Sequence, residues 1–130
     1  MTLKTSNPDT MPPPAALYSQ VLEIPANARW VFLAGQTGIA LDGSVPEGFE
    51  AQSRQIWQNT VAGLASVGMT VDDIVRINVY ATNAADIQHL TSIRAEFLND
   101  HIPPSTWLVV SQLAQPQWVV EQEVIAAKVD

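Results

Sequence analysis

The sequence contains no cysteine, so neither a disulfide framework nor thiolate chemistry can operate in it. It is also poor in positive charge, with 6 lysine and arginine residues against 13 aspartate and glutamate residues and a formal net charge of −7. The basic residues are scattered along the chain, whereas binding to phosphates needs several converging cations. We therefore expect no nucleic-acid partner.

Long apolar runs are missing as well. No stretch is long enough to span a bilayer, and residues 1–14 combine one lysine with Pro12-Pro13-Pro14 and no apolar segment, which does not match a secretory signal. We expect a cytoplasmic protein with no membrane partner. With 130 residues, 47% hydrophobic and 15% charged, the chain has the length and composition of one globular domain.

The first residues differ in composition from the rest. Residues 1–16 hold four of the nine prolines together with small polar residues, and we predict an extended arm there, followed by a single domain over 17–130. Apolar alternation predicts strands over 18–24 and 30–35, and the turn residues at 25–28 suggest that they form a hairpin. A glycine-containing loop over 36–48 follows.

Helical spacing of apolar residues predicts a first helix from Phe49 to Val67, capped by Gly68, and a second helix from Ile87 to about Asn99. Between them, residues 74–81 alternate as a strand with one polar face, carrying Arg76, Asn78 and Tyr80. A second hairpin is predicted from strands at 106–113 and 118–129. The order ββαβαββ indicates an α+β fold.

In such a fold both helices cover the same face of the sheet, because right-handed crossovers lead them there. The other face is left uncovered. Monomers rarely expose a broad, partly apolar sheet face, so we expect it to be buried against copies of the same chain.

Several short signatures occur in a fixed order along the chain. They are Leu17-Tyr18-Ser19-Gln20, Leu33-Ala34-Gly35-Gln36, Gln58-Asn59-Thr60 with Leu64 and Gly68, residues 74–80, Phe97, Pro103-Pro104, and residues 121–126. In this combination, over about residues 17–127, the sequence resembles the Rid family (reactive intermediate deaminase; RidA/YjgF, endoribonuclease L-PSP-like).

The resemblance implies a chorismate-mutase-like fold and a homotrimer whose sheets line a central barrel, with clefts between neighbouring subunits. It also implies hydrolysis of reactive 2-imino (enamine) acids to 2-oxo acids and ammonia, without a metal or an organic cofactor. In the family archetype, an arginine after the Pro-Ala pair grips the carboxylate of the substrate, a task that suits a planar, permanently charged group.

This chain departs from that pattern. Ser105 stands where the arginine belongs, which would place the chain in an arginine-lacking subgroup, and Leu90 falls at about the place of an asparagine of the archetypal pocket. Glu121 is retained at the position where the family uses a glutamate to hold or activate water. The resemblance therefore implies acid–base capacity with changed specificity.

Glu121 is the candidate catalytic residue. From spacing alone, Glu121 and Glu123 share one face of a strand, either as a carboxylate pair that raises the pKa of one member or as the solvated face of an edge strand. The resemblance favours the catalytic interpretation for Glu121 only.

The candidate ligand-binding residues also have simpler interpretations. Ser105 and Thr106 could donate hydrogen bonds or only shape the start of a strand, and Trp107 could stack on a ligand or only pack in the core. Tyr18 and Gly35 fall at pocket positions of the family; the alternative for Gly35 is that it only ends a strand.

The two histidines, His89 and His101, do not make a metal site without further ligands. Two functions fit the sequence: an imine or enamine hydrolase with altered specificity, or a non-catalytic protein that binds or senses a metabolite. A third, ribonuclease activity, disagrees with the acidic charge.

Overall fold

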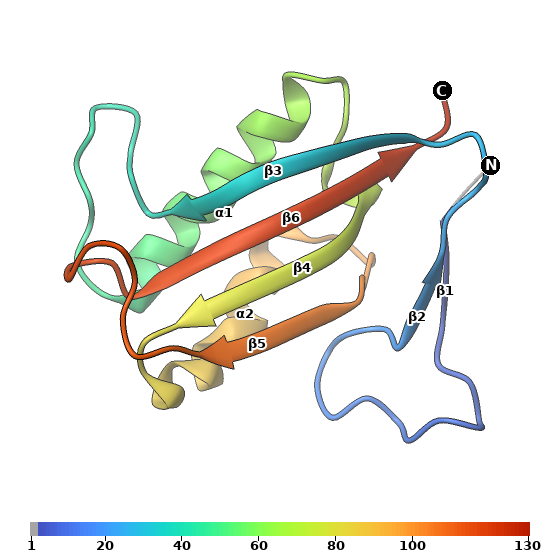
Figure 1. Cartoon of the computed structure of the whole chain (residues 1–130), viewed down its shortest axis with the longest axis horizontal. Helices are drawn as coiled ribbons and strands as arrows, with labels where there is room; N and C mark the ends of the chain where they lie inside the picture. The colour runs from blue at the N-terminus through green and yellow to red at the C-terminus, as the bar shows by residue number, and fades with distance from the viewer. Residues whose placement is uncertain (1–2) are drawn as a thin grey trace.

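The computed structural model describes residues 3–130, so the first two residues of the predicted arm lie outside it. The fold is α+β, with two helices and a mixed sheet (Figure 1). Two single-turn 3₁₀ helices, Val71–Asp73 and Ala84–Asp86, precede β4 and α2. The strands and helices are β1 (Lys4–Ser6), β2 (Val21–Glu23), β3 (Arg29–Thr37), α1 (Phe49–Ala65), β4 (Ile74–Ala81), α2 (Ile87–Phe97), β5 (Ser105–Val109) and β6 (Val120–Lys128).

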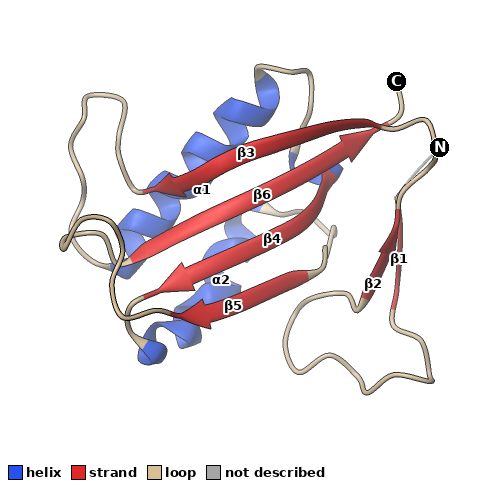
Figure 2. Cartoon of the chain, in the orientation of Figure 1, coloured by secondary structure: helices blue, strands red, loops and turns tan. Residues whose placement is uncertain are grey.

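Four strands form the main sheet in the order β3-β6-β4-β5 (Figure 2). β4 and β5 are parallel, because the helix α2 carries the chain back between them, as parallel strands require. β6 runs antiparallel to β3 on one side and to β4 on the other. The last strand of the chain therefore lies inside the sheet.

The first predicted hairpin is wrong. β2 is shorter than predicted and pairs with β1 in a separate two-stranded sheet, although the turn between β2 and β3 forms, with Ala28 N donating to Pro25 O over 3.2 Å. Two hydrogen bonds hold the residues before β2 away from β3. The Ser19 hydroxyl donates to the Ile102 carbonyl, and Gln20 N donates to Asn7 Oδ1 over 2.8 Å. The predicted arm thus contributes a short strand.

The second predicted hairpin is also wrong, because β5 and β6 do not pair. The connection between them passes the end of β4, where Val110 N donates to Ala81 O (2.8 Å) and Thr82 N donates to Val119 O (3.1 Å). Runs of β-branched and aromatic residues identified both strands, but such runs carry no information about which neighbour each strand pairs with.

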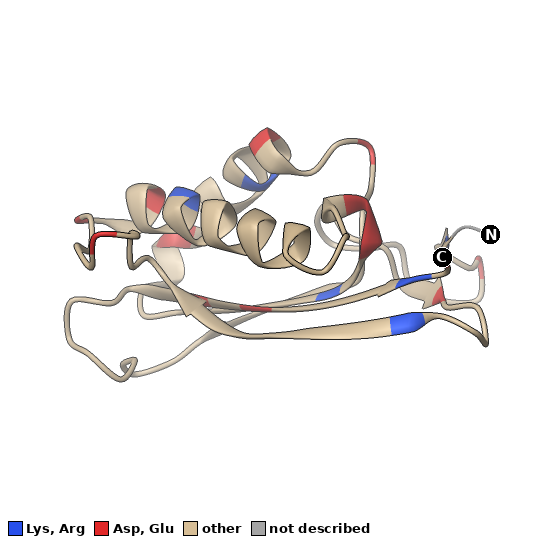
Figure 3. Cartoon of the chain, turned by 90° about the horizontal axis from the view of Figure 1, so that it is seen from above, with Lys and Arg blue, Asp and Glu red and all other residues tan. Residues whose placement is uncertain are grey.

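The two helices lie on the same side of the main sheet, as predicted (Figure 3). Ile56, Trp57 and Leu64 of α1 form one core with Ile77 and Val79 of β4, and each of these side chains is at most 2% exposed. The bounds of α1 also follow the prediction. It begins after Gly48 and is followed by Gly68, whose φ of 74° is a conformation that favours glycine.

The opposite face of the sheet is open (Figure 3). Phe32 is 71% exposed and Trp30 is 51% exposed, and their rings stack with centroids 6.4 Å apart. Leu108 of β5, 50% exposed, adds a third large apolar side chain to this face, in the same row as Tyr80 of β4. Within residues 3–130, no helix is long and apolar enough to cross a membrane.

Candidate functional site

Glu121 lies at the beginning of β6, on the open face. It is paired with Thr37 of β3 on one side and with Tyr80 of β4 on the other, and it is half-buried. β6 is therefore a central strand, not the solvated edge strand that the simpler interpretation of Glu121 and Glu123 assumed. No donor within residues 3–130 forms a hydrogen bond to the Glu121 carboxylate.

Gly35 makes room for this carboxylate. The register between β3 and β6 shifts between Leu33 and Gln36, and Gly35 lies in that irregularity. A Cβ at position 35 would lie 2.2 Å from Oε2 of Glu121 and 3.0 Å from its Cδ, closer than real contacts allow. The glycine thus lets the glutamate side chain lie against the backbone of β3.

A second carboxylate on the same face is already engaged. The Tyr80 hydroxyl donates a hydrogen bond to Glu123, and this bond, together with burial, raises the pKa of Tyr80 above its usual value. Next to this pair, the Arg76 guanidinium donates to the Thr106 hydroxyl. Of the two glutamates, Glu121 is therefore the one whose carboxylate accepts no hydrogen bond within residues 3–130.

Gln52 fixes the chain just before Glu121. Its side chain is 1% exposed and makes three hydrogen bonds: Nε2 donates to the carbonyls of Pro46 (3.0 Å) and Gln117 (2.9 Å), and Oε1 accepts from Val119 N (3.0 Å). One residue of α1 thereby ties the loop after β3 and the segment that leads into β6. Such a buried, fully bonded amide holds its surroundings in one arrangement.

The structure brings only some of the predicted site residues together. Gly35 and Glu121 are in contact, and Thr106 lies on the same open face two strands away. Ser105 and Trp107 pair with Ile77 and Val79 of β4, and therefore point toward the helices. Trp107 packs there on Phe49, with ring centroids 6.0 Å apart.

Tyr18 does not reach Glu121 within one chain. It lies before β2, where its hydroxyl accepts a hydrogen bond from Ala15 N over 3.2 Å, and β2 belongs to the separate sheet. The sequence-based account also missed Gln52, although a signal was present: a polar residue lies beside Phe49, Ser53 and Ile56 on the buried side of the first helix.

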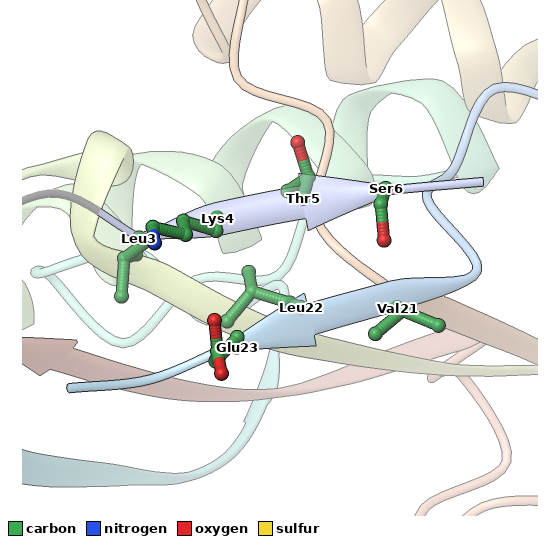
Figure 4. Close-up of a pocket in the computed structure, with 7 residues that line it drawn as sticks. All are labelled: Leu3, Lys4, Thr5, Ser6, Val21, Leu22 and Glu23. Carbon is green, nitrogen blue, oxygen red and sulfur yellow. The ribbon is translucent and has the colours of Figure 1, made fainter. Parts of the chain in front are cut away.

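Metal binding finds no support in the geometry of residues 3–130, where no three His, Asp or Glu side chains come together as ligands. A hollow of about 920 Å³ lies beside β1 and β2 (Figure 4). Its lining comes from these strands and the preceding residue alone, residues 3–6 and 21–23, and none of the predicted site residues is among them. The candidate site thus remains the open face around Glu121.

Known proteins resemble this chain in sequence and in the arrangement of strands and helices. Residues 9–128 match the family model described as Endoribonuclease L-PSP. A RutC family protein of Aquifex aeolicus is 30% identical over 119 residues, which cover 90% of this chain and 93% of that protein. The crystal structure of YyfB from Yersinia pestis, a Rid family protein whose function is unknown, superposes with a TM-score of 0.88 at 26% identity, covering 98% of this chain and 100% of YyfB.

One relative carries an enzymatic name. The 2-iminobutanoate/2-iminopropanoate deaminase of Dermatophagoides farinae is 24% identical over 104 residues, which cover 78% of this chain and 79% of that protein. The family match spans nearly the whole sequence. The chain therefore belongs to the Rid family.

Proposed function

We propose that this protein hydrolyses an imine or enamine of a small metabolite, with Glu121 positioning and activating the attacking water. The observation that carries the proposal is the Glu121 carboxylate itself. It lies against Gly35 on the open face of the sheet, and its acceptor atoms form no hydrogen bond within residues 3–130. A carboxylate in this state can accept a proton from water.

The reaction uses only water. Glu121 accepts a proton from a water molecule as the water oxygen forms a bond to the imine carbon, and the electron pair of the C=N bond moves to nitrogen. Protonation of that nitrogen by Glu121 and the added hydroxyl group then allows the C–N bond to break, which leaves a carbonyl compound and ammonia. An enamine first takes a proton on carbon and gives up a proton from nitrogen, which converts it to the imine.

A homotrimer would complete the site. The open face exposes Trp30 and Phe32, and within residues 3–130 no strand lies beside the outer edge of β3. Association between copies would cover both features. Tyr18 lies away from Glu121 within one chain, so a neighbouring copy would have to supply a tyrosine to the cleft. A cytoplasmic location and a one-domain organisation over 17–130 remain part of the proposal.

The substrate should differ from the simple 2-imino acids of the archetype, because Ser105 cannot replace a guanidinium. Loss of two parallel charge-assisted hydrogen bonds would cost on the order of a hundredfold in catalytic efficiency. Ser105 also pairs with Ile77 on the helix side of the sheet. We propose Thr106, on the open face, as a ligand contact in preference to Ser105 and Trp107.

The second candidate function is non-catalytic binding or sensing of a metabolite. It is favoured by the missing arginine, since a retained cleft without the residue that holds the substrate would bind other ligands without turnover.

Ammonia release from a panel of imines, generated in situ, separates the two functions. The hydrolase requires release by the wild type that falls to the uncatalysed rate in Glu121→Gln. It also requires that Glu47→Gln, a change at an exposed glutamate in a loop outside the main sheet, behaves as the wild type does. Saturable ligand binding with no Glu121-dependent ammonia would support the binding protein instead.

A further inference from the structure

Arg94 is a buried cation without a partner. It lies on α2 with 5% of its surface exposed, and neither Nε nor Nη2 has a hydrogen-bond partner within residues 3–130. Burial lowers its pKa to about 10, so the guanidinium is still charged at neutral pH. An unpaired charge held away from water is costly, and native structures generally compensate it.

Arg94 is one of the residues that line a cavity of about 360 Å³. This volume lies near the lower end of the range for small-molecule sites. The walls are largely apolar and come from three segments: Leu17 of the N-terminal region, Leu98 at the end of α2, and Ile102 and Pro103 before β5. The bond from the Ser19 hydroxyl to the Ile102 carbonyl holds the N-terminal region against this cavity.

The other charged groups nearby do not neutralise Arg94. Asp100 borders the cavity but is exposed, and within residues 3–130 it forms no ion pair with Arg94. His101 also borders the cavity, with its Nε2 2.5 Å from the Ile74 carbonyl oxygen. Glu96, two residues after Arg94 on α2, is paired with Arg54 at 2.8 Å.

We propose that this cavity binds a small carboxylate with a short apolar substituent, and that Arg94 holds the carboxylate group. A guanidinium is the side chain best matched to a carboxylate, and the apolar walls fit a hydrocarbon group of a few carbons. Within one copy the cavity lies on the helix side of the sheet, whereas Glu121 lies on the open face. Binding at Arg94 therefore does not depend on the proposed hydrolysis.

Butyrate and butyramide are matched probes, because they share the apolar chain and differ in charge. Titration of ¹⁵N-labelled protein should move the Arg94 Nε–H resonance, assigned by its absence in Arg94→Met, with butyrate and not with butyramide. Arg94→Met keeps the length of the side chain and removes the charge. It should weaken butyrate binding by about tenfold or more, since charge-assisted hydrogen bonds are lost. Arg54→Met, a change at an exposed arginine, should leave binding unchanged.

Ile102→Trp provides a test that keeps Arg94 in place, because the larger side chain fills the cavity; it should abolish butyrate binding if the cavity is the site. Equal affinity for butyrate in the wild type, Arg94→Met and Ile102→Trp would overturn the proposal, as would an unmoved Arg94 resonance at saturating butyrate. Failure of imine hydrolysis in the ammonia assay would leave these results untouched.

Discussion

The two faces of the main sheet differ in what their side chains contact. On the helix side, Ile77, Val79 and Val124 are at most 1% exposed and pack under α1 and α2. On the open side, Phe32 and Trp30 remain more than half exposed beside charged and hydroxyl-bearing residues. The same strands carry both sets, because successive residues of a strand point to opposite faces.

The difference shows how the fold divides its tasks. The helices α1 and α2 of the same chain cover one face, and the core between them and the sheet supplies the stability of the domain. The open face is uncovered within one chain, and the polar groups of the proposed hydrolysis site, Glu121 and its neighbours Glu123 and Tyr80, lie on it. We therefore expect changes to the covered face to act mainly on unfolding, and changes to the open face to act on assembly and activity.

The largest expected effect is at Trp57. This side chain is 2% exposed and stacks on Phe97 with ring centroids 5.7 Å apart. Trp57→Ala should lower the free energy of unfolding by about 3–5 kcal/mol, since it leaves a cavity in the core. Trp30→Ala, on the open face, is the control and should cost much less in denaturant unfolding of the dissociated chain. A larger loss in the free energy of unfolding from Trp30→Ala than from Trp57→Ala would contradict the assignment of stability to the covered face.

Gln52 connects the covered face to the site. Gln52→Leu removes three hydrogen bonds and leaves two carbonyls and the Val119 N–H without partners, at a cost of about 1–3 kcal/mol in the free energy of unfolding. Gln55→Leu, also on α1, loses one bond, to Asn59, and should change stability little. The account also requires Gln52→Leu to reduce the proposed activity, because the segment before Glu121 loosens; full activity in a destabilised variant would argue against this coupling.

Gly35→Ala should affect activity more than stability. The added Cβ would lie 2.2 Å from Oε2 of Glu121, and the end of that side chain can swing away at low energetic cost. We expect a small change in melting temperature together with loss of Glu121-dependent ammonia release. Gly63→Ala is the matched control on α1, where the new methyl group meets Leu33 Cδ2 at 3.1 Å on the covered side. Unchanged ammonia release in Gly35→Ala would show that the proposed activity does not need Gly35 to make room for Glu121.

The smallest effect is a pH dependence on the open face. The bond to Glu123 raises the pKa of Tyr80, so the folded protein holds the phenol proton more tightly than the unfolded chain does. The resulting stabilisation is complete below the ordinary tyrosine pKa of about 10 and is lost as the pH rises through the raised value. The free energy of unfolding, measured from pH 8 to 12, should therefore fall less steeply in Tyr80→Phe. Identical slopes would show that the bond contributes nothing.

Local patterns predicted the elements of the fold. Alternation at Ile77 and Val79 identified β4 and its buried face, and Gly68 marked the end of the first helical segment correctly. Strand pairing was not predictable in this way. Neither hairpin formed, because the N-terminal region is held at Ile102 and because β6 enters the sheet between β3 and β4.

The site was only partly readable from the sequence. The proximity of Gly35 and Glu121 depends on the pairing of β3 with β6, which no local pattern contains. Arg94 lies within the predicted second helix beside Ile93, but its lack of partners within residues 3–130 depends on segments distant in sequence. Side-chain periodicity gives the face of a residue, whereas its neighbours are set by the tertiary arrangement.

The central claim is that the open face is an interface between copies of this chain. Static light scattering at micromolar concentration tests it most directly. We predict a mass three times the 14.1 kDa of one chain. A mass of 14.1 kDa at this concentration would contradict the claim and would remove the shared cleft from the proposed function.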